Sequence, residues 1–345
     1  MYAKRFSAQH IYILSIGLLV LAGLSSIVIG PMAISYKQSL LALIPGDHQL
    51  AQHVSLVIHQ IRLPRTLLCF AIGAILAICG SVLQGLFRNP LADPGIIGIT
   101  GGAGLGAALA IVLFAPLTST FPQLLNFAIV PVFAFIGGAI STVMVYRLGT
   151  DKNGTSVMIM LLAGVAITAI SAAGLGLLNY VADDEALRDL SLWSMGSLAG
   201  ATWSGILLAY CTLALLFSYC YRHCNNLNAF LLGEAEARHM GVNTQHLKRN
   251  LIIVCAAGVG ITVSICGPIG FIGLVIPHVG RMLTGPNHKT LLPISALLGG
   301  LILLVADMIA RSAFSPQELP VGIITAILGA PFFIYLLSTQ KRHIS

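Results

Sequence analysis

Charged side chains are scarce in this sequence of 345 residues, because Asp, Glu, Lys and Arg together make up only 8% of it. A soluble domain usually carries about a quarter of such residues. Hydrophobic residues make up 57%, and this excess of apolar surface must face lipid rather than water. The composition therefore excludes an ordinary soluble protein. The net charge of +7 reflects membrane topology and gives no support for nucleic-acid binding.

Motifs for nucleotide binding and hydrolysis are also missing. No lysine in the sequence follows a glycine, so the G-K-[ST] part of a phosphate-binding loop is absent. Neither H-E-x-x-H nor G-x-S-x-G occurs. The sequence therefore predicts a protein that is not itself an ATPase, and more generally not an enzyme.

Acidic residues are nearly absent from the interior of the apolar segments. Asp307 is the main exception, and it precedes Arg311 by one helical turn, so the two side chains can pair along one helix face. A carrier driven by a proton or sodium gradient normally needs buried acids as coupling sites. Their scarcity argues against a secondary transporter. The lack of a catalytic constellation argues against a membrane-embedded enzyme.

The seven cysteines do not form a disulfide framework, because their number is odd and most of them lie inside apolar runs. Cys220, His223 and Cys224 could suggest a metal clip. Their spacing matches no standard zinc site and no second ligand pair follows. We therefore expect no bound metal and no permanently bound cofactor.

Ten apolar segments are present, and a membrane span takes about 20 such residues. They cover residues 11–32, 65–84, 96–116, 124–147, 157–180, 203–221, 251–266, 270–283, 291–311 and 320–338. The first segment is too long for the core of a signal peptide and is interpreted as a retained span. The sequence thus predicts an all-α polytopic membrane protein with about ten transmembrane helices, in which residues 1–345 form one domain.

The distribution of Lys and Arg orients these spans. With a cytoplasmic N-terminus, 13 of the 18 Lys and Arg residues lie in cytoplasmic segments and 5 lie outside. This bias predicts cytoplasmic N- and C-termini. Three of the outside arginines, Arg62, Arg65 and Arg311, flank predicted spans and need a reason to be there. Gly98, Gly102 and Gly106 recur every four residues, a spacing that favours close packing of helices.

The longest cytoplasmic segment, about residues 222–250, is called the hook here. It mixes charged residues with apolar ones, and EAEARHM at 234–240 predicts a short helix that Gly241 terminates. Two interpretations remain open, a docking element for a cytosolic partner and an ordinary solvated loop. The apolar content of the segment favours docking.

Several long motifs then occur in a fixed order: RLPR at 62–65, GAILAICGSVLQGLFRNPLADPGIIGITGGAGLG at 73–106, LGEAEARHMGV at 232–242, GPIGFIGLVIPHVGR at 267–281 and ELPVGIITAILGAPFFIYLL at 318–337. This set resembles the permease subunits of bacterial ABC importers for iron-siderophores, haem and cobalamin. The resemblance runs from about residue 60 to the C-terminus. It implies a type II ABC importer permease fold in the bacterial inner membrane and a homodimer. It also implies two cytoplasmic ATP-binding subunits that use ATP and one periplasmic substrate-binding protein.

The resemblance also implies roles for individual residues. Arg62, Arg65 and Arg311 would meet glutamates of the binding protein. Asn89 and Leu91 would form a cytoplasmic gate, with a second gate at the turn of residues 155–158. The residues of the hook that would couple to the ATPase are Gly233, Glu234, Glu236, Arg238 and Gly241.

The cargo is the least determined property. Residues 178–203 resemble the haem-importing members more than the cobalamin or siderophore ones, so haem (hemin) is the expected cargo, followed by a ferric siderophore and then cobalamin. Arg188 could attract a haem propionate, and Tyr180 and Met195 could line the same mouth. Alternatively, Arg188 pairs with Asp184 one turn earlier on the same helix.

Overall fold

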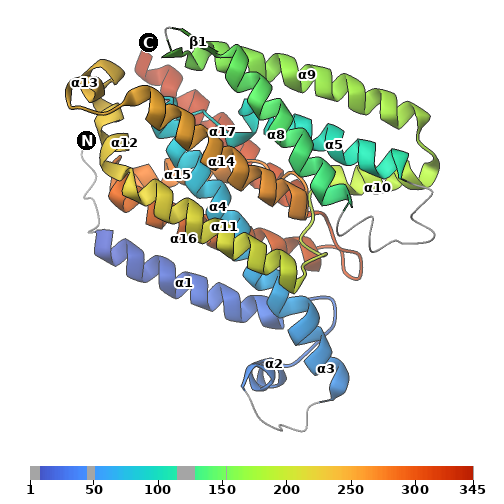
Figure 1. Cartoon of the computed structure of the whole chain (residues 1–345). Coiled ribbons are helices and arrows are strands. Elements are labelled where there is room, and N and C mark those ends of the chain that lie inside the picture. The colour runs from blue at the N-terminus through green and yellow to red at the C-terminus, as the bar shows by residue number, and fades with distance from the viewer. Residues whose placement is uncertain (1–7, 45–50, 115–128, 153, 345) are drawn as a thin grey trace.

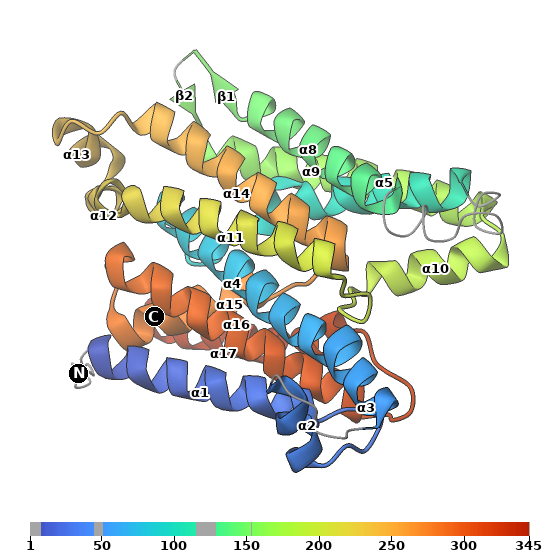
Figure 2. The same ribbon diagram turned by 60° about the horizontal axis from the view of Figure 1, so that its bottom comes forward.

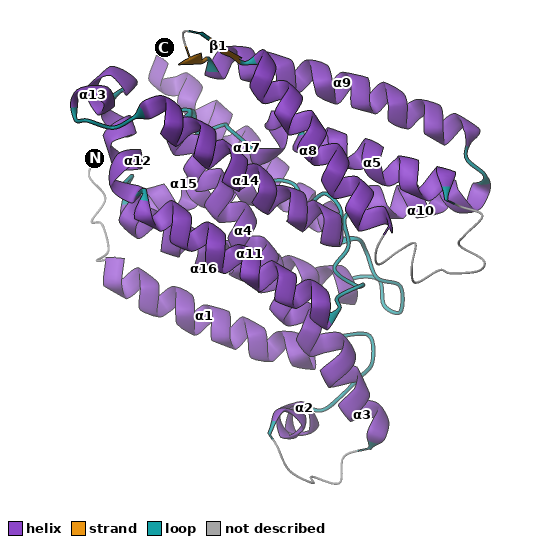
Figure 3. Cartoon of the chain, viewed as in Figure 1, coloured by secondary structure: helices purple, strands orange, loops and turns teal. Residues whose placement is uncertain are grey.

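The computed structural model of the chain describes residues 8–44, 51–114, 129–152 and 154–344, and it is almost entirely helical (Figure 3). The first half contains α1 (Ala8–Val28), α2 (Tyr36–Leu43), α3 (Gln52–Val57), the π-helix η1 (Ile58–Arg62), α4 (Leu63–Leu86), the 3₁₀ helix η2 (Pro94–Ile97), α5 (Ile99–Leu113) and α8 (Val130–Leu148). The second half contains α9 (Val157–Val181), α10 (Asp184–Ser194), α11 (Trp203–Arg222), α12 (Cys224–Leu232), α13 (Glu234–His239), α14 (Thr244–Cys266), α15 (Ile272–Thr284), α16 (His288–Ser312) and α17 (Val321–Ile344). A short antiparallel hairpin, β1 (Thr150–Asp151) and β2 (Gly154–Thr155), joins α8 to α9.

Each of the ten predicted spans corresponds to one apolar helix among the described residues. Seven of these helices are long and apolar enough to cross a membrane. Three shorter apolar helices, α5, α15 and the part of α17 at 321–335, complete the set. The second span is longer than predicted, because α3, η1 and α4 run on as one helix from Gln52 to Leu86.

Helix α4 forms the centre of the bundle and the other helices surround it (Figures 1 and 2). In the most apolar stretch of the long helix that contains α4, 89% of the residues are buried. In the corresponding stretches of α1, α9 and α11, 28% of the residues are buried. Burial on all sides explains why α4 is apolar around its whole circumference. The outer helices expose apolar side chains that lipid or a partner subunit must cover.

Glycines allow the helix backbones of this core to approach closely. A Cβ atom added at Gly73 of α4 would lie 2.3 Å from the carbonyl oxygen of Gly299 in α16. The predicted packing of the glycine stripe is confirmed for Gly102 and Gly106, which face the backbone of α8. Gly98, at the N-cap of α5, also lies against α8, because a Cβ atom there would lie 2.7 Å from the hydroxyl of Ser141.

A proline inside α15 is compensated by a side chain of α4. Pro277 has no N–H, so the carbonyl of Gly273 loses its helical donor. The side-chain amide of Gln84 donates to the carbonyls of Gly273 and Leu274 at 3.3 and 3.1 Å, and Arg281 donates to the oxygen of Gln84. The break in the helix therefore leaves no unpaired backbone group at this point.

The two ends of the bundle differ. Helix α13, the β1–β2 hairpin, the start of α1 and the end of α17 lie at one end, whereas α2, α3 and α10 lie at the other (Figures 1 and 2). The start of the first span and the end of the last thus lie on the same side as the hook, as an even number of crossings requires.

Candidate functional site

The hook folds as two short helices, α12 and α13, that lead into α14. Gly241 follows α13 with φ +84°, and the N–H groups of Gly241 and Val242 donate to the carbonyls of Arg238 and Ala237, both at 3.0 Å. This is a Schellman motif, which requires the left-handed backbone that glycine adopts easily. The predicted short helix and its glycine terminator are therefore confirmed.

Glu234 is the centre of charge in the hook. One of its carboxylate oxygens accepts from Lys248 at 2.5 Å, and the other accepts from Arg238 at 3.3 Å. Partial burial raises the pKa of Glu234, but the hydrogen bond and charge of Lys248 and the charge of Arg238 outweigh it, so the pKa is lower than usual. The carboxylate therefore stays ionised at neutral pH and holds α13 against α14.

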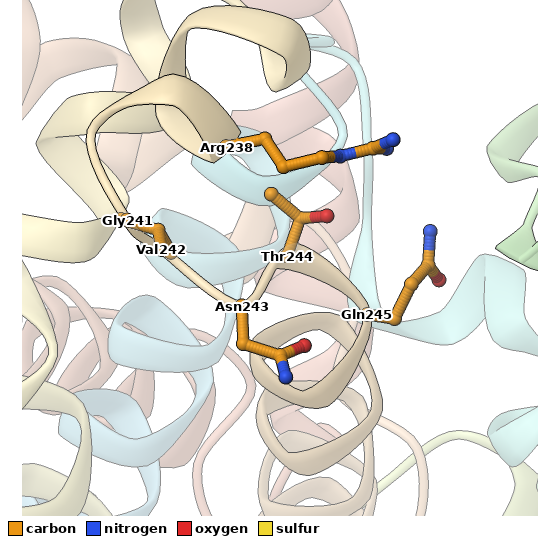
Figure 4. Close-up of a pocket in the computed structure, with 6 residues that line it drawn as sticks. All are labelled: Arg238, Gly241, Val242, Asn243, Thr244 and Gln245. Carbon is orange, nitrogen blue, oxygen red and sulfur yellow. The ribbon is translucent and has the colours of Figure 1, made fainter.

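The hook also contacts the turn that precedes α9. Gln245 in the first turn of α14 accepts from the backbone N–H of Thr155 at 3.0 Å, and Lys248 donates to the carbonyl of Thr155 at 3.3 Å. A cleft of about 430 Å³ opens beside these residues and is lined by Arg238, the α13–α14 connection and Gln245 (Figure 4). The predicted coupling segment and one predicted gate turn are thus joined directly.

Asn89 and Leu91, the other expected gate residues, lie in the turn after α4. The side-chain oxygen of Asn89 accepts from the N–H of Leu91 at 2.9 Å, which forms an Asx turn. Arg88 adopts a left-handed conformation with φ +49° just before it. This geometry fixes the path of the chain between α4 and η2, and it does not test whether the turn acts as a gate.

The structure buries the side chains of Arg62, Arg65 and Arg311. Their exposed fractions are 3%, 4% and 2%. Arg62 donates to the carbonyls of Ile27 and Val28 at 2.9 and 2.6 Å, and also to that of Met32. These contacts tie the start of α4 to the end of α1. The physical reason is that a buried guanidinium must satisfy its donors inside the protein.

Arg65 and Arg311 share one buried carboxylate. Asp307 is fully buried and lies 2.8 Å from Arg65 and 3.6 Å from Arg311, so the predicted Asp307–Arg311 pair is confirmed. Arg65 also contacts Glu318 at 2.5 Å, and the Glu318 side chain is 32% exposed. Sequence reasoning missed the partners of Arg65, because they lie more than 240 residues away from it.

The residues proposed for a cargo path are all exposed. Tyr180, near the end of α9, is 87% exposed, and Met195 at the C-cap of α10 is 41% exposed. Arg188 is exposed on α10. Arg188 and Asp184 are both described, and no ion pair within 4.0 Å joins them, so the alternative pairing is not formed. Helix α10, which carries Arg188 and ends at Met195, lies at the end of the molecule opposite the hook (Figure 2).

Comparison with known proteins identifies the architecture. The FecCD transport family model matches residues 18–339. The chain belongs to the FecCD transport family. The hemin transport system permease protein HmuU of Yersinia pestis is 43% identical over 290 residues, which cover 82% of this chain and 84% of HmuU. The vitamin B12 import system permease protein BtuC of Salmonella paratyphi A is 39% identical over 343 residues, 99% of both chains.

A solved structure of another transporter shows the same fold. It is described as a metal-chelate type ABC transporter in an inward-facing conformation, and it superposes with a TM-score of 0.81 at 34% identity over 96% of this chain and 99% of its own. This FecCD chain is therefore the membrane permease subunit of an ABC importer and has no catalytic site for ATP hydrolysis. It crosses the inner membrane several times and pairs with separate ATPase and substrate-binding subunits.

Proposed function

We propose that this FecCD permease imports haem (hemin) from the periplasm to the cytoplasm. Two copies would form a homodimer around a central path, with two ATPases bound at their hooks and one binding protein at the opposite end. Both termini would then be cytoplasmic. The observation that carries the choice of haem is the 43% identity with a hemin permease over most of both chains.

The surface at the end opposite the hook agrees with an apolar cargo that carries acidic groups. Leu187, Leu192 and Met195 of the α10 region are exposed and offer apolar contact to a macrocycle. Arg188 lies on the same helix and offers a guanidinium to a propionate. Because its charge is solvated, it would steer entry more than it would bind tightly.

Cobalamin is the second candidate cargo, because the B12 permease matches nearly the full length of both chains. The test is to reconstitute the wild-type chain with its ATPase and binding protein in proteoliposomes. Hemin, cobalamin and a ferric siderophore are then compared as stimulators of ATP hydrolysis and as transported cargo. Hemin is expected to give the largest stimulation and uptake, and preferential uptake of cobalamin would contradict the proposal.

The structure argues further against ion-coupled transport. Asp307, the one acid deep in a predicted span, forms ion pairs with Arg65 and Arg311, which assigns it a role as their counterion rather than as a coupling site. Energy would instead enter through the hook, where Gly233, Glu234, Glu236, Arg238 and Gly241 form the proposed ATPase-coupling surface. The turns at Asn89–Leu91 and at residues 155–158 are the proposed cytoplasmic gates.

We also propose that the binding protein docks through Arg62, Arg65 and Arg311 by an exchange of partners. Because the guanidinium groups are buried, an incoming carboxylate must displace an existing partner. Glu318 is the most accessible partner of the cluster, since its side chain is 32% exposed while that of Asp307 is fully buried. Arg65 is therefore the arginine best placed to exchange an internal carboxylate for one from the binding protein.

A further inference from the structure

Two side chains of α14 connect α13 of the hook to the turn at Thr155. The amide nitrogen of Gln245 donates to Glu234 at 3.3 Å, and its amide oxygen accepts from the N–H of Thr155 at 3.0 Å. The ammonium group of Lys248 donates to Glu234 at 2.5 Å and to the carbonyl of Thr155 at 3.3 Å. Both backbone groups of Thr155 and both oxygens of the Glu234 carboxylate are thus bridged by the same two side chains.

The chemistry of these groups fixes the orientation of the Gln245 amide. A carboxylate can only accept hydrogen bonds, so the donor end of the Gln245 amide must face Glu234 and the acceptor end must face the N–H of Thr155. Lys248 is only 3% exposed, so its charge depends on the carboxylate and the carbonyl rather than on water. If Glu234 moved away from Lys248, the ammonium group would be a buried cation without a counterion.

Residues on the far side of this bridge make further hydrogen bonds of their own. The N–H of Ser156 donates to the carbonyl of Gly149 at 2.8 Å, and the hydroxyl groups of Thr150 and Thr155 lie 3.1 Å apart. Gly154 has φ +117°, and a Cβ atom there would lie 2.4 Å from the amide nitrogen of Gln245. Glycine at this position therefore lets Gln245 reach the backbone.

We propose that Gln245 and Lys248 are positioning residues that transmit displacement of α13 to the Thr155 turn and so to the start of α9. This inference rests on the proposed function, in which the ATPases move the hook. When α13 moves relative to α14, the two side chains lose the carboxylate that orients them and release the backbone of Thr155. The hairpin and α13 lie at the same end of the bundle on either side of the start of α14 (Figure 2).

The test uses the complete reconstituted complex with the variants Gln245→Leu and Lys248→Met. Arg249→Met is the matched control, because Arg249 is the exposed neighbour of Lys248 on α14 and its one described side-chain hydrogen bond is to Asn250. Cargo-stimulated ATP hydrolysis and cargo uptake are measured on the same vesicles. Each of the two test variants is expected to lower uptake per ATP hydrolysed by about fivefold or more, and the control is expected to match wild type.

A second readout separates transmission from a merely structural role. Met158 is 73% exposed just after the turn, so Met158→Cys can be modified by a maleimide once the exposed Cys211 is replaced by serine. In the otherwise wild-type complex, the modification rate is expected to change when ATP is added. In the Gln245→Leu complex, ATP is expected to leave that rate unchanged.

The outcomes distinguish this inference from the proposed function. Absence of cargo uptake by the wild-type complex would overturn the proposed function, and the transmission role would be lost with it. The inference alone would be overturned if the wild type imports cargo and Gln245→Leu behaves like it in both measurements. In that case Gln245→Leu would give the wild-type uptake per ATP, and the modification rate of Met158→Cys in it would still change when ATP is added. If Lys248→Met does not fold, Gln245→Leu decides the question, because it removes no charge.

Discussion

At the scale of single residues, the buried carboxylate of Asp307 is the acid that two buried arginines depend on. It is the shared counterion of Arg65 and Arg311, and removing one member of a buried ion pair leaves an uncompensated charge. We expect Asp307→Leu to destabilise the protein by about 3–5 kcal/mol. The measurement is the midpoint of thermal unfolding of the purified chain in detergent.

Glu318→Gln is the matched control for this prediction, because Glu318 also contacts Arg65 but is partly exposed. Its loss should cost about 1 kcal/mol or less. Equal destabilisation by the two variants would show that Asp307 is not the principal counterion of the cluster.

The ion pairs of Glu234 lead us to expect that the stability of the hook depends on pH. Its pKa is lowered in the folded chain, so the folded state binds its proton less readily than the unfolded state does. The stabilisation is therefore present above the unfolded pKa, about 4.3, and is lost as the pH falls through the folded pKa. Amide hydrogen exchange of α13 should be constant, once corrected for intrinsic rates, between pH 5 and pH 8 and should rise below pH 4, each figure being approximate.

Glu234→Gln provides the control for that experiment. It removes the titrating group, so the α13 amides should exchange faster already at neutral pH and show no further step on acidification. A step of the same size in both proteins would assign the titration to another group.

Some properties of individual residues could be predicted from the sequence, and others could not. The Asp307–Arg311 pair and the Gly241 terminator follow from local spacing, because both depend only on the geometry of one helix. Burial of Arg62 and Arg65 could not be predicted, because their partners come from α1, α16 and the segment before α17. These contacts join segments that are distant in the sequence, so local patterns do not reveal them.

At the scale of helices, Gln84 and Pro277 show how α4 and α15 depend on each other. Gln84→Leu would remove the side-chain donor of the Gly273 carbonyl, whose helical donor is missing at Pro277, and the second contact to the Leu274 carbonyl. We expect this variant to lower stability by about 1–3 kcal/mol, measured by thermal unfolding in detergent.

A double-mutant cycle identifies the cause. Pro277→Ala restores an N–H that can donate to the carbonyl of Gly273 within α15, so Gln84→Leu should cost less in the Pro277→Ala background than in the wild type. An equal cost in both backgrounds would show that Gln84 stabilises the protein through Arg281 or through packing instead.

The ten helices themselves were predictable from their apolar runs, because a segment in lipid must satisfy its own backbone hydrogen bonds, although α5 and α15 are shorter than a typical span. The long fusion of α3, η1 and α4 was not predicted, because the apolar run of the second span begins only at residue 65. Proline is tolerated in the first turn of α4, directly after the π-helix η1.

At the scale of the whole molecule, the placement of the hook and of the start of α1 and the end of α17 at one end determines how the chain must sit in the membrane (Figure 1). The bias of Lys and Arg predicts that this end is cytoplasmic. Tyr36 in α2 is 67% exposed at the opposite end, and Met240 in the hook is 53% exposed. These two positions can therefore report on the two sides of the membrane separately.

The prediction is tested with Tyr36→Cys and Met240→Cys, each in a chain whose exposed Cys211 is replaced by serine. A maleimide that cannot cross membranes should label Tyr36→Cys on intact spheroplasts and should label Met240→Cys only after permeabilisation. The chain with Cys211→Ser alone measures background, because the other six cysteines are buried. Labelling of Met240→Cys on intact cells would place the hook outside, where no ATPase could reach it, and would contradict both the orientation and the proposed route of energy into the permease.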